Sequence, residues 1–290
     1  MLLATLRLPN GTTQAARREG DDLVLLPHPD AAAALAAGVS TMSGGRRVPL
    51  TGAELAPPVP HPAKIFCVGL NYRLHIAESG EQTPTYPTLF AKFARTLTGP
   101  ADAIVVPAET AKLDWEAELV AVIGRPVRHA EPRTAAAAVG GFVVGNDVSV
   151  RDWQGRTSQW LQGKSFEATT PIGPYLLTAD ECGSAPDLRI TCVVNGAVKQ
   201  DSRTSDLLFG VADIVAYIST IVTLEPGDLL FTGTPGGVGQ SRPTPEFLVP
   251  GDVLETTIEG IGTLRNAIVG DSRRAASSTS PLSENHGSGG

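Results

Sequence analysis

Cysteine is scarce in this chain, which has three cysteines among 290 residues. Cys67, Cys182 and Cys192 are odd in number and lack Cys-x-x-Cys spacing, so neither a disulfide framework nor a zinc site is indicated. Long apolar runs are also missing: none approaches the roughly 20 residues that span a bilayer, and residues 1–8 lack the basic start of a signal peptide. We therefore expect a cytoplasmic protein that is neither secreted nor inserted in a membrane.

Basic side chains are outnumbered by acidic ones, 23 to 30, which gives a formal charge of −7. No basic stripe offers contacts to phosphates, so neither nucleic acid nor an anionic membrane is expected as a partner. The composition, 42% apolar and 18% charged, is typical of a globular protein that is long enough to bury a sizeable core. One large domain or two unequal domains are expected.

Short apolar runs between turn residues dominate residues 63–270 and predict strands. These runs lie at 65–68, 104–106, 119–123, 142–144, 188–194, 229–231, 253–258 and 264–269. The hairpin signal Asn195-Gly196 and the Pro-Gly-Asp turns at 226–228 and 250–252 favour antiparallel pairing. Apolar residues at helical spacing from 211 to 222 predict an amphipathic helix against the sheet. The expected fold class is α+β and rich in β-structure.

Composition divides the chain into three segments. Residues 1–62 predict a small β-rich N-terminal domain, with strands at 2–8 and 23–26, a helix from Asp30 to Gly38, and a proline-rich linker at its end. Residues 63–270 are expected to form the main domain. Residues 271–290 are rich in serine and glycine and predict a disordered tail.

Carboxylates occupy a segment that should be buried. Glu116 and Glu118 belong to an apolar strand, in which residues i and i+2 project from the same face. If Asp147, at the end of another apolar strand, faces them, each pair of charges 4 Å apart repels by roughly 4 kcal/mol at an effective dielectric near 20. A divalent cation would remove this conflict, and an all-oxygen site suits Mg²⁺, Mn²⁺ or Ca²⁺ with positions left for substrate. The alternative is that a glutamate pairs with Lys112 or Arg125 on a solvated strand face.

His75 and Glu78, at i and i+3, would share one face of a helical turn. A histidine oriented by a carboxylate makes a general base, a role worth about 10² to 10⁴ in rate, whereas the alternative is a surface ion pair. Segment 79–87 that follows has the composition of a lid or of an idle loop. The glycine-rich loop 231–239 could offer N–H groups to an anion, but it lacks the lysine and the spacing of a P-loop.

Arg151 and Gln154 follow Asp147 by four and seven residues and share its face if a helix begins there. Both could reach a substrate carboxylate or a metal-bound water, or Arg151 could merely neutralise Asp152 or the acidic cluster. Lys164 stands among glycine and apolar residues, so it is either a counter-ion of carboxylates or a catalytic cation.

Taken in this order, the motifs resemble those of the fumarylacetoacetate hydrolase family over about residues 64–269. The matching segments are Gly-Leu-Asn-Tyr-x-x-His-x-x-Glu, Asp-Trp-Glu-x-Glu-Leu, Gly-x-x-x-Gly-Asn-Asp-Val-Ser-x-Arg-Asp-x-Gln, Gly-Lys-Ser-Phe, Pro-Ile-Gly-Pro and Thr-Gly-Thr-Pro-x-Gly-Val-Gly. The resemblance implies a mixed β-sandwich roll, a homodimer, and Mg²⁺ or Mn²⁺ on a Glu-Glu-Asp triad. The chain departs from the family pattern at Glu167-Ala168 and at 92–96. The resemblance therefore does not define which residues contact the distal part of the substrate.

The resemblance also implies a role for each matched residue. The metal ligands would be Glu116, Glu118 and Asp147, the catalytic residues His75, Glu78 and Lys164, and the substrate-binding residues Arg151, Gln154, Gly233 and Thr234. The implied reaction is metal-dependent hydrolysis of a C–C bond in a 2,4-dioxo acid through an enolate held by the metal. The alternative on the same site is isomerisation or decarboxylation of 2-hydroxydienedioate- or oxaloacetate-type acids. A third alternative is a structural ion in a protein that is no enzyme.

Overall fold

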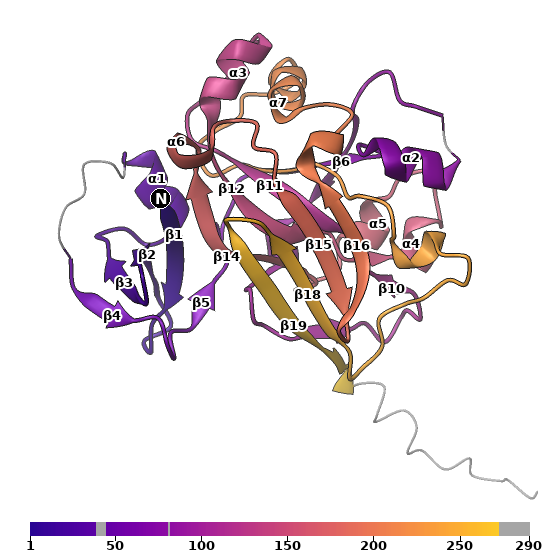
Figure 1. Ribbon diagram of the computed structural model, residues 1–290, viewed down its shortest axis with the longest axis horizontal. Coiled ribbons are helices and arrows are strands. Elements are labelled where there is room, and N and C mark those ends of the chain that lie inside the picture. Colours follow the sequence, from indigo (N-terminus) through magenta and orange to yellow (C-terminus); the bar gives the residue numbers. More distant parts are fainter. Residues whose placement is uncertain (39–44, 81, 273–290) are drawn as a thin grey trace, which may run out of the picture.

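The computed structural model describes residues 1–38, 45–80 and 82–272, and the tail expected at 271–290 lies almost wholly outside them. A large mixed sheet runs through the molecule (Figure 1). Its strands are, in spatial order, β4 (Arg47–Pro49), β3 (Asp22–Leu25), β2 (Thr13–Glu19), β1 (Leu2–Arg7), β14 (Thr170–Thr178), β12 (Val139–Asn146), β11 (Ala117–Ile123), β17 (Leu229–Phe231), β6 (Ile65–Gly69) and β7 (Thr88–Lys92), with β5 (Leu55–Ala56) beside β1 and β8 (Leu97–Thr98) beside β14.

A smaller sheet packs in front of the large one in Figure 1. Its order is β16 (Ala197–Arg203), β15 (Arg189–Val194), β18 (Val253–Ile258), β19 (Gly262–Gly270) and β9 (Ile104–Val106), and β10 (Leu113–Asp114) pairs separately with β13 (Ser149–Val150). The α-helices are α1 (Ala31–Ala36), α2 (Arg73–Ser79), α3 (Pro132–Ala138), α4 (Arg151–Gln154), α5 (Leu161–Lys164), α6 (Ala179–Cys182) and α7 (Val211–Ser219). Short 3₁₀ turns lie at Ala94–Thr96, Thr204–Asp206 and Gly239–Ser241. No helix of the described residues is long and apolar enough to cross a membrane.

Strand β11 is buried on both faces, so its sequence reads as a continuous apolar run. Leu119, Ala121 and Ile123 belong to the cluster between the sheets, whereas Val120 and Val122 belong to a cluster on the opposite face. Because Glu118 has the parity of Val120, its carboxylate projects on that opposite face. The sheet thereby fixes the direction of one candidate ligand.

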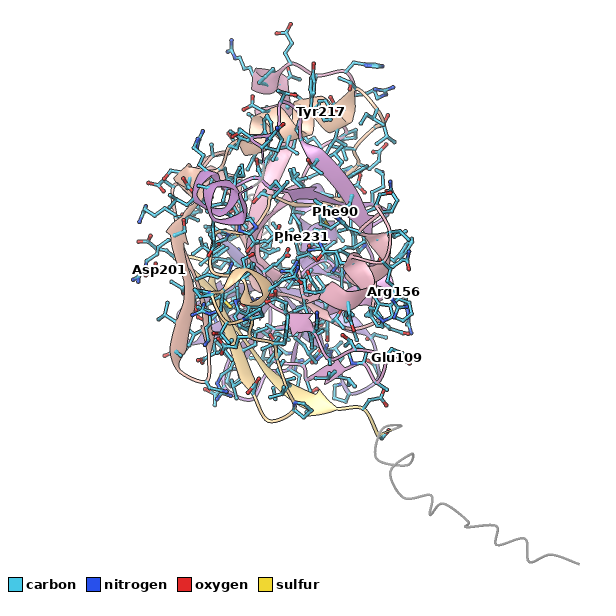
Figure 2. All side chains as sticks on the ribbon, turned by 90° about the vertical axis from the view of Figure 1, so that its right-hand side faces the viewer. Phe90, Glu109, Arg156, Asp201, Tyr217 and Phe231 are labelled. Atoms are coloured by element: carbon cyan, nitrogen blue, oxygen red, sulfur yellow. The ribbon has the colours of Figure 1, made fainter. Side chains whose placement is uncertain are left out.

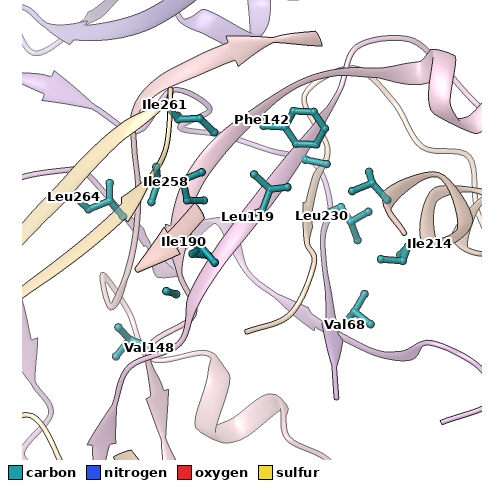
Figure 3. Packing of buried hydrophobic residues seen from close by; sticks show 14 of the residues in the cluster. Val68, Leu119, Phe142, Val148, Ile190, Ile214, Leu230, Ile258, Ile261 and Leu264 are labelled. Atoms are coloured by element: carbon teal, nitrogen blue, oxygen red, sulfur yellow. The ribbon is translucent and has the colours of Figure 1, made fainter. Parts of the chain in front are cut away.

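The main core lies between the two sheets (Figure 3). Leu119 and Phe142 of the large sheet pack there with Ile190 and Ile258 of the small sheet. Helix α7 adds Ile214 to the same cluster, as expected for an amphipathic helix against a sheet. These contacts hold the strands that carry the acidic residues.

The N-terminal strands join the large sheet directly, because β1 pairs with β14 in antiparallel register. Leu3 and Leu26 share a buried cluster with Val120 of the main sheet, and a smaller cluster lies around Leu23. Helix α1 is capped by Asp30, whose carboxylate accepts the N–H of Ala33 at 2.8 Å. The boundary predicted at residue 62 thus falls between parts that share one sheet, and the division into domains stays a prediction.

The expected α+β, β-rich fold is confirmed, and every strand expected within 63–270 is present. The hairpin at Asn195-Gly196 joins β15 to β16, with Gly196 at φ +78°. The expectation of antiparallel pairing is incomplete, because β6 with β17, β8 with β14, and β9 with β19 are parallel. The predicted helix ends at Ser219 and not at 222. Strands β2, β7 and β14 and helix α3 are among the elements that were not expected.

Candidate active site

Three carboxylates converge where β11 and β12 end. Glu116 immediately precedes β11, Glu118 lies within it, and Asp147 directly follows β12. The strands are tied here by Asp147 N, which donates to Glu116 O at 2.8 Å, and by Glu116 N, which donates to Asn146 Oδ1 at 2.9 Å. Each carboxylate offers an oxygen, and the three oxygens lie within 4.8 Å of one another. The sequence motif therefore describes a real cluster in space.

All three acids are buried, with Asp147 at 0%, Glu118 at 1% and Glu116 at 7% exposure. The alternative of a solvated strand face is therefore wrong. The cations beside Glu116 are not Lys112 or Arg125. They are Arg151 and Lys164.

Buried cations surround the carboxylates. Lys164 Nζ, at the end of α5, lies 2.7 Å from Glu116 Oε2 and 2.8 Å from Asp147 Oδ2. Lys92 Nζ, at the end of β7, lies 2.6 Å from Asp147 Oδ1. Arg151 Nη1 lies 2.6 Å from Glu116 Oε1. Lys164 thus occupies a counter-ion position, which was one of its two expected roles.

The charges around Glu116 and Glu118 differ. Burial raises the pKa of Glu116, but the positive charges of Lys164 and Arg151 outweigh burial and lower this pKa to about 2. Burial, together with the charges of Asp147 and Glu116, raises the pKa of Glu118 well above its ordinary value. The contacts of Glu118 include the N–H of Gly233 at 2.7 Å, a neutral donor.

The cluster fits a divalent cation. Its donors are carboxylate oxygens alone, which is the chemistry that Mg²⁺, Mn²⁺ and Ca²⁺ prefer. The repulsion that raises the pKa of Glu118 is also the repulsion that a bound cation would relieve. Glu116, Glu118 and Asp147 are therefore the residues that could hold such an ion.

Arg151 does not share a helix with Asp147, because α4 begins at Arg151 itself. Its Nε donates to Asp114 Oδ2 at 2.8 Å and its Nη1 donates to Gln154 Oε1 at 2.9 Å. Arg151 contacts Glu116 of the acidic cluster, whereas Asp152 accepts from the hydroxyl of Thr110, and the role of Arg151 toward a substrate stays a prediction. The remaining nitrogen, Arg151 Nη2, is buried and has no hydrogen-bond partner in the part of the chain that the structure describes. A ligand oxygen would satisfy it.

The glycine-rich loop binds the carboxylates of the chain itself. Gly233 N, in a residue at φ +103°, donates to Glu118 at 2.7 Å, and a Cβ here would lie 2.9 Å from that of Asn71. Farther along, the N–H groups of Gly239 and Gln240 donate to Asp114 at 2.7 and 2.9 Å. The N–H groups of Gly233 and Gly239 are thus engaged by carboxylates of the chain, and Gly233 is not at the cavity wall. A substrate contact by Gly233 stays a prediction.

His75 and Glu78 lie on one face of α2, as their spacing predicts. Nδ1 of His75 is 3.5 Å from Oε2 of Glu78, and this oxygen also accepts the N–H of Gly237 at 3.0 Å. The side chain of His75 is 13% exposed and that of Glu78 is 34% exposed. This pair is therefore anchored to the glycine-rich loop rather than free on the surface.

A cavity of about 330 Å³ brings most of the candidate residues together. Its wall includes His75, Glu116, Arg151, Gln154, Lys164 and Thr234, and the aromatic rings of Phe90 and Trp160 complete it. Phe90 lies in the middle of the molecule in Figure 2. Such a volume is at the small end of ligand pockets, so the cavity suits a small polar molecule.

None of the described residues of segment 79–87 lines the cavity. Residue 81 lies outside the described residues, and Tyr86 stacks on Tyr217 of α7 with ring centroids 6.2 Å apart, at the periphery of the molecule in Figure 2. A lid role stays a prediction. The two segments that depart from the family pattern are in contact, because exposed Arg95 forms an ion pair with exposed Glu167 outside the cavity.

Lys92, Asp114 and Gln200 were missed as parts of the site. Lys92 contacts Asp147, Asp114 joins Arg151 to the glycine-rich loop, and Gln200 contacts Thr234. A signal for Lys92 is the charge that ends the apolar strand Thr88–Lys92, and a signal for Asp114 is its place next to the Glu-x-Glu motif. Gln200 lies on a mostly polar strand and gives no local signal.

Comparison with known proteins identifies one family. Residues 64–269 match the family described as "Fumarylacetoacetate (FAA) hydrolase C-terminal". The mitochondrial oxaloacetate tautomerase Fahd2a of Rattus norvegicus is 43% identical over 223 residues, which are 77% of this chain and 71% of that protein.

Two solved structures are similar over nearly their whole length. A fumarylacetoacetate hydrolase from Exiguobacterium antarcticum has a TM-score of 0.84 and 30% identity, and covers 93% of this chain and 100% of its own. A 5-carboxymethyl-2-hydroxymuconate delta-isomerase from Mycobacterium smegmatis has a TM-score of 0.78 and 34% identity, with coverage of 93% and 100%.

Proposed function

The chain belongs to the fumarylacetoacetate hydrolase family, and on this premise we propose that it is a metal-dependent enzyme that interconverts the keto and enol forms of a small 2-oxo acid, with oxaloacetate as the first substrate to test. This proposal moves the isomerase or decarboxylase alternative ahead of hydrolysis. The names of similar proteins support the change, since one is an oxaloacetate tautomerase and another a delta-isomerase.

The acidic cluster would hold the metal of this reaction. Glu116, Glu118 and Asp147 are its candidate ligands, and Mg²⁺ or Mn²⁺ is the proposed ion, with Ca²⁺ as a further candidate. When bound, such an ion supplies Lewis-acid chemistry by stabilising negative charge on a keto oxygen, which is worth several kcal/mol.

The cavity wall suits the anionic groups of the substrate. Arg151 lines the cavity and its buried Nη2 has no partner among the described residues, while Gln154 and Thr234 add polar side chains to the same wall. A carboxylate placed at Arg151 Nη2 would receive a charge-assisted hydrogen bond and would satisfy a buried donor. A small dicarboxylate therefore fits both the size and the charge of the wall.

The observation that carries the proposal is the position of His75. Among the acid–base side chains of the wall, Glu116 and Lys164 are paired with each other, and Arg151 stays charged at all relevant pH values. His75 pairs instead with Glu78, which is not a carboxylate of the cluster, and so can accept a proton from the carbon next to the keto group and return it. Moving a proton between carbon and oxygen is all that tautomerisation requires.

Hydrolysis of a 2,4-dioxo acid is the second candidate, and the same pair favours it. Glu78 is held by both His75 and the N–H of Gly237, so the pair could orient and deprotonate a water molecule. Lys164 would then stabilise the negative charge that develops on the leaving fragment. The two candidates differ in whether a C–C bond breaks.

One experiment separates them. With saturating Mg²⁺, the decay of the enol absorbance of oxaloacetate and the release of pyruvate from an acylpyruvate are measured in parallel. We expect enol decay to be faster than in Mg²⁺ solution without protein, and His75→Ala to slow it by about 10² to 10⁴. The exposed histidine variant His61→Ala should behave as the unmodified protein.

Two results would contradict the proposal. If enol decay with the protein equals that with Mg²⁺ alone, or survives chelation of the metal, the proposed tautomerase is wrong. If pyruvate release is faster than enol decay and is lost in both His75→Ala and Glu78→Ala, hydrolysis takes its place.

A further inference from the structure

The buried amide of Gln200 connects the two parts of the site. Gln200 belongs to β16 of the small sheet and is 1% exposed. Its Oε1 accepts from the backbone N–H of Ala117 at 3.0 Å, between the two candidate metal ligands Glu116 and Glu118. Its Nε2 lies 2.8 Å from Thr234 Oγ1, in the glycine-rich loop.

The backbone fixes the orientation of this amide. The N–H of Ala117 can only donate, so it must face Oε1, and the carbonyl of Pro235, 2.8 Å from Nε2, can only accept. A flipped amide would set two donors against each other and two acceptors against each other. Gln200 therefore donates to both Pro235 O and Thr234 Oγ1.

This orientation determines what the hydroxyl of Thr234 can do. Since Oγ1 already accepts from Gln200, the hydroxyl keeps its own proton free to be donated elsewhere. Thr234 is 6% exposed and forms part of the cavity wall. A molecule bound in the cavity could therefore place an oxygen next to this side chain. The hydroxyl is thus prepared as a donor toward the cavity.

We propose that Gln200 is a positioning residue that makes the Thr234 hydroxyl a hydrogen-bond donor to an oxygen of the bound acid. Gln200 is not at the cavity wall, so it acts through Thr234 and not through the ligand. The identity of the acid as a 2-oxo acid rests on the proposed function. The hydrogen-bond direction rests on the contacts of Gln200 alone.

The test measures the dissociation constant of oxalate, a small unreactive dianion, by calorimetry at saturating Mg²⁺ in the full-length protein. Thr234→Val removes the donor with little change of shape, and we expect oxalate to bind about tenfold more weakly. Thr234→Ser keeps the hydroxyl and should bind as the unmodified protein does. Gln200→Glu keeps an acceptor for the N–H of Ala117 but replaces the donor to Thr234 by a second acceptor. The Thr234 hydroxyl would then donate its hydrogen bond to this carboxylate oxygen and not to oxalate. We expect Gln200→Glu to weaken oxalate binding at least as much as Thr234→Val.

The double variant Gln200→Glu with Thr234→Val decides between positioning and general structural damage. If Gln200 acts through Thr234, the dissociation constant of oxalate for the double variant is no higher than the higher of the two values for the single variants. If its effect is structural, Gln200→Glu weakens binding by the same factor in both backgrounds, and the proposal is wrong. The melting temperature of each variant without ligand gives a second readout, and Gln14→Glu, far from the cavity, is the control for the added charge.

The outcomes also separate this inference from the proposed function. If the unmodified protein binds oxalate with Mg²⁺ but does not convert oxaloacetate, the proposed reaction fails and the variants still test Gln200. If Thr234→Val binds oxalate as tightly as the unmodified protein, the inference fails whatever the reaction is. If the unmodified protein does not bind oxalate at all, both are overturned.

Discussion

Lys92 shows how strongly a single residue can depend on its surroundings. Its side chain is completely buried, and its ammonium group lies 2.6 Å from Asp147. A charge in this position is stable only because it is paired, since an isolated ion pays several kcal/mol for leaving water. Lys92 and Asp147 are therefore expected to support each other in the folded protein.

Replacement of Lys92 by methionine should destabilise the protein by about 3 to 5 kcal/mol, because it leaves Asp147 with one cation fewer in a buried place. Urea unfolding followed by tryptophan fluorescence measures the loss. Adding Mg²⁺ should restore part of it, since an ion bound to the folded state alone shifts the equilibrium toward that state.

The control is Lys199→Met, which breaks the pair of Lys199 with the more exposed Glu246, 2.6 Å away. That change should cost less than about 1 kcal/mol. An equally small loss for Lys92→Met would show that the buried pair contributes nothing.

The residue scale also shows what the sequence can reveal about the site. Glu116, Glu118 and Asp147 were predicted because an acid in an apolar strand conflicts with burial, and that conflict is visible locally. Lys92 and Gln200 were not predicted as site residues, because their partners lie 55 and 34 positions away. Only the folded sheets bring these pairs together.

At the scale of elements, an ion pair between Arg7 and Asp102 joins the end of β1 to the segment that precedes β9. Arg7 Nη1 lies 2.7 Å from Asp102 Oδ1. Burial raises the pKa of Asp102, but hydrogen bonds from Arg7 and from the N–H of Gly99 outweigh burial, and this pKa is lowered. The folded state thus binds this proton less readily than the unfolded state.

A pH dependence of stability follows from this shift. The contribution of Asp102 is full above its ordinary pKa of 3.8 and is lost as the pH falls through the lower pKa of the folded state. Asp102→Asn should therefore lower the free energy of unfolding by less than about 1 kcal/mol near neutral pH, because the pair is partly exposed. The difference from the unmodified protein should shrink below pH 3.8. Urea titrations across pH measure it, and a difference that grows in acid would contradict the assignment.

Elements were predicted where one physical signal dominates. The apolar run of β11 and the Asn195-Gly196 hairpin were found because burial and turn conformation each dictate the sequence. Strand β2 has the sequence Thr-Gln-Ala-Ala-Arg-Arg-Glu, whose polar residues hide its alternation, and β14 contains two prolines and a glycine. Both are strands because neighbours in the sheet pair with them.

At the scale of the whole molecule, the shared sheet predicts that residues 1–62 and the remainder of the chain unfold cooperatively. Leu3, in β1, is fully buried in a cluster with residues of the main sheet. The tryptophans, by contrast, are Trp115, Trp153 and Trp160, so fluorescence reports only on the main part.

Leu3→Ala should lower the stability measured by tryptophan fluorescence by about 2 to 5 kcal/mol, with one transition, because both parts unfold together. Leu8→Ala, at a partly exposed position, should cost less. If fluorescence shows no shift while circular dichroism shows an early transition, residues 1–62 are an independent domain. The homodimer and the cytoplasmic location expected from the sequence stay predictions.

The placement of the acidic residues has a consequence for the evolution of this protein. Glu116, Glu118 and Asp147 are set by the inner strands β11 and β12, and of the three only Glu116 reaches the cavity wall, to which short helices and the glycine-rich loop also contribute. Substitutions in the helices and the loop can change the lining of the cavity without disturbing the three candidate ligands. An inherited scaffold can thus diversify into tautomerases, isomerases and hydrolases through changes at its rim.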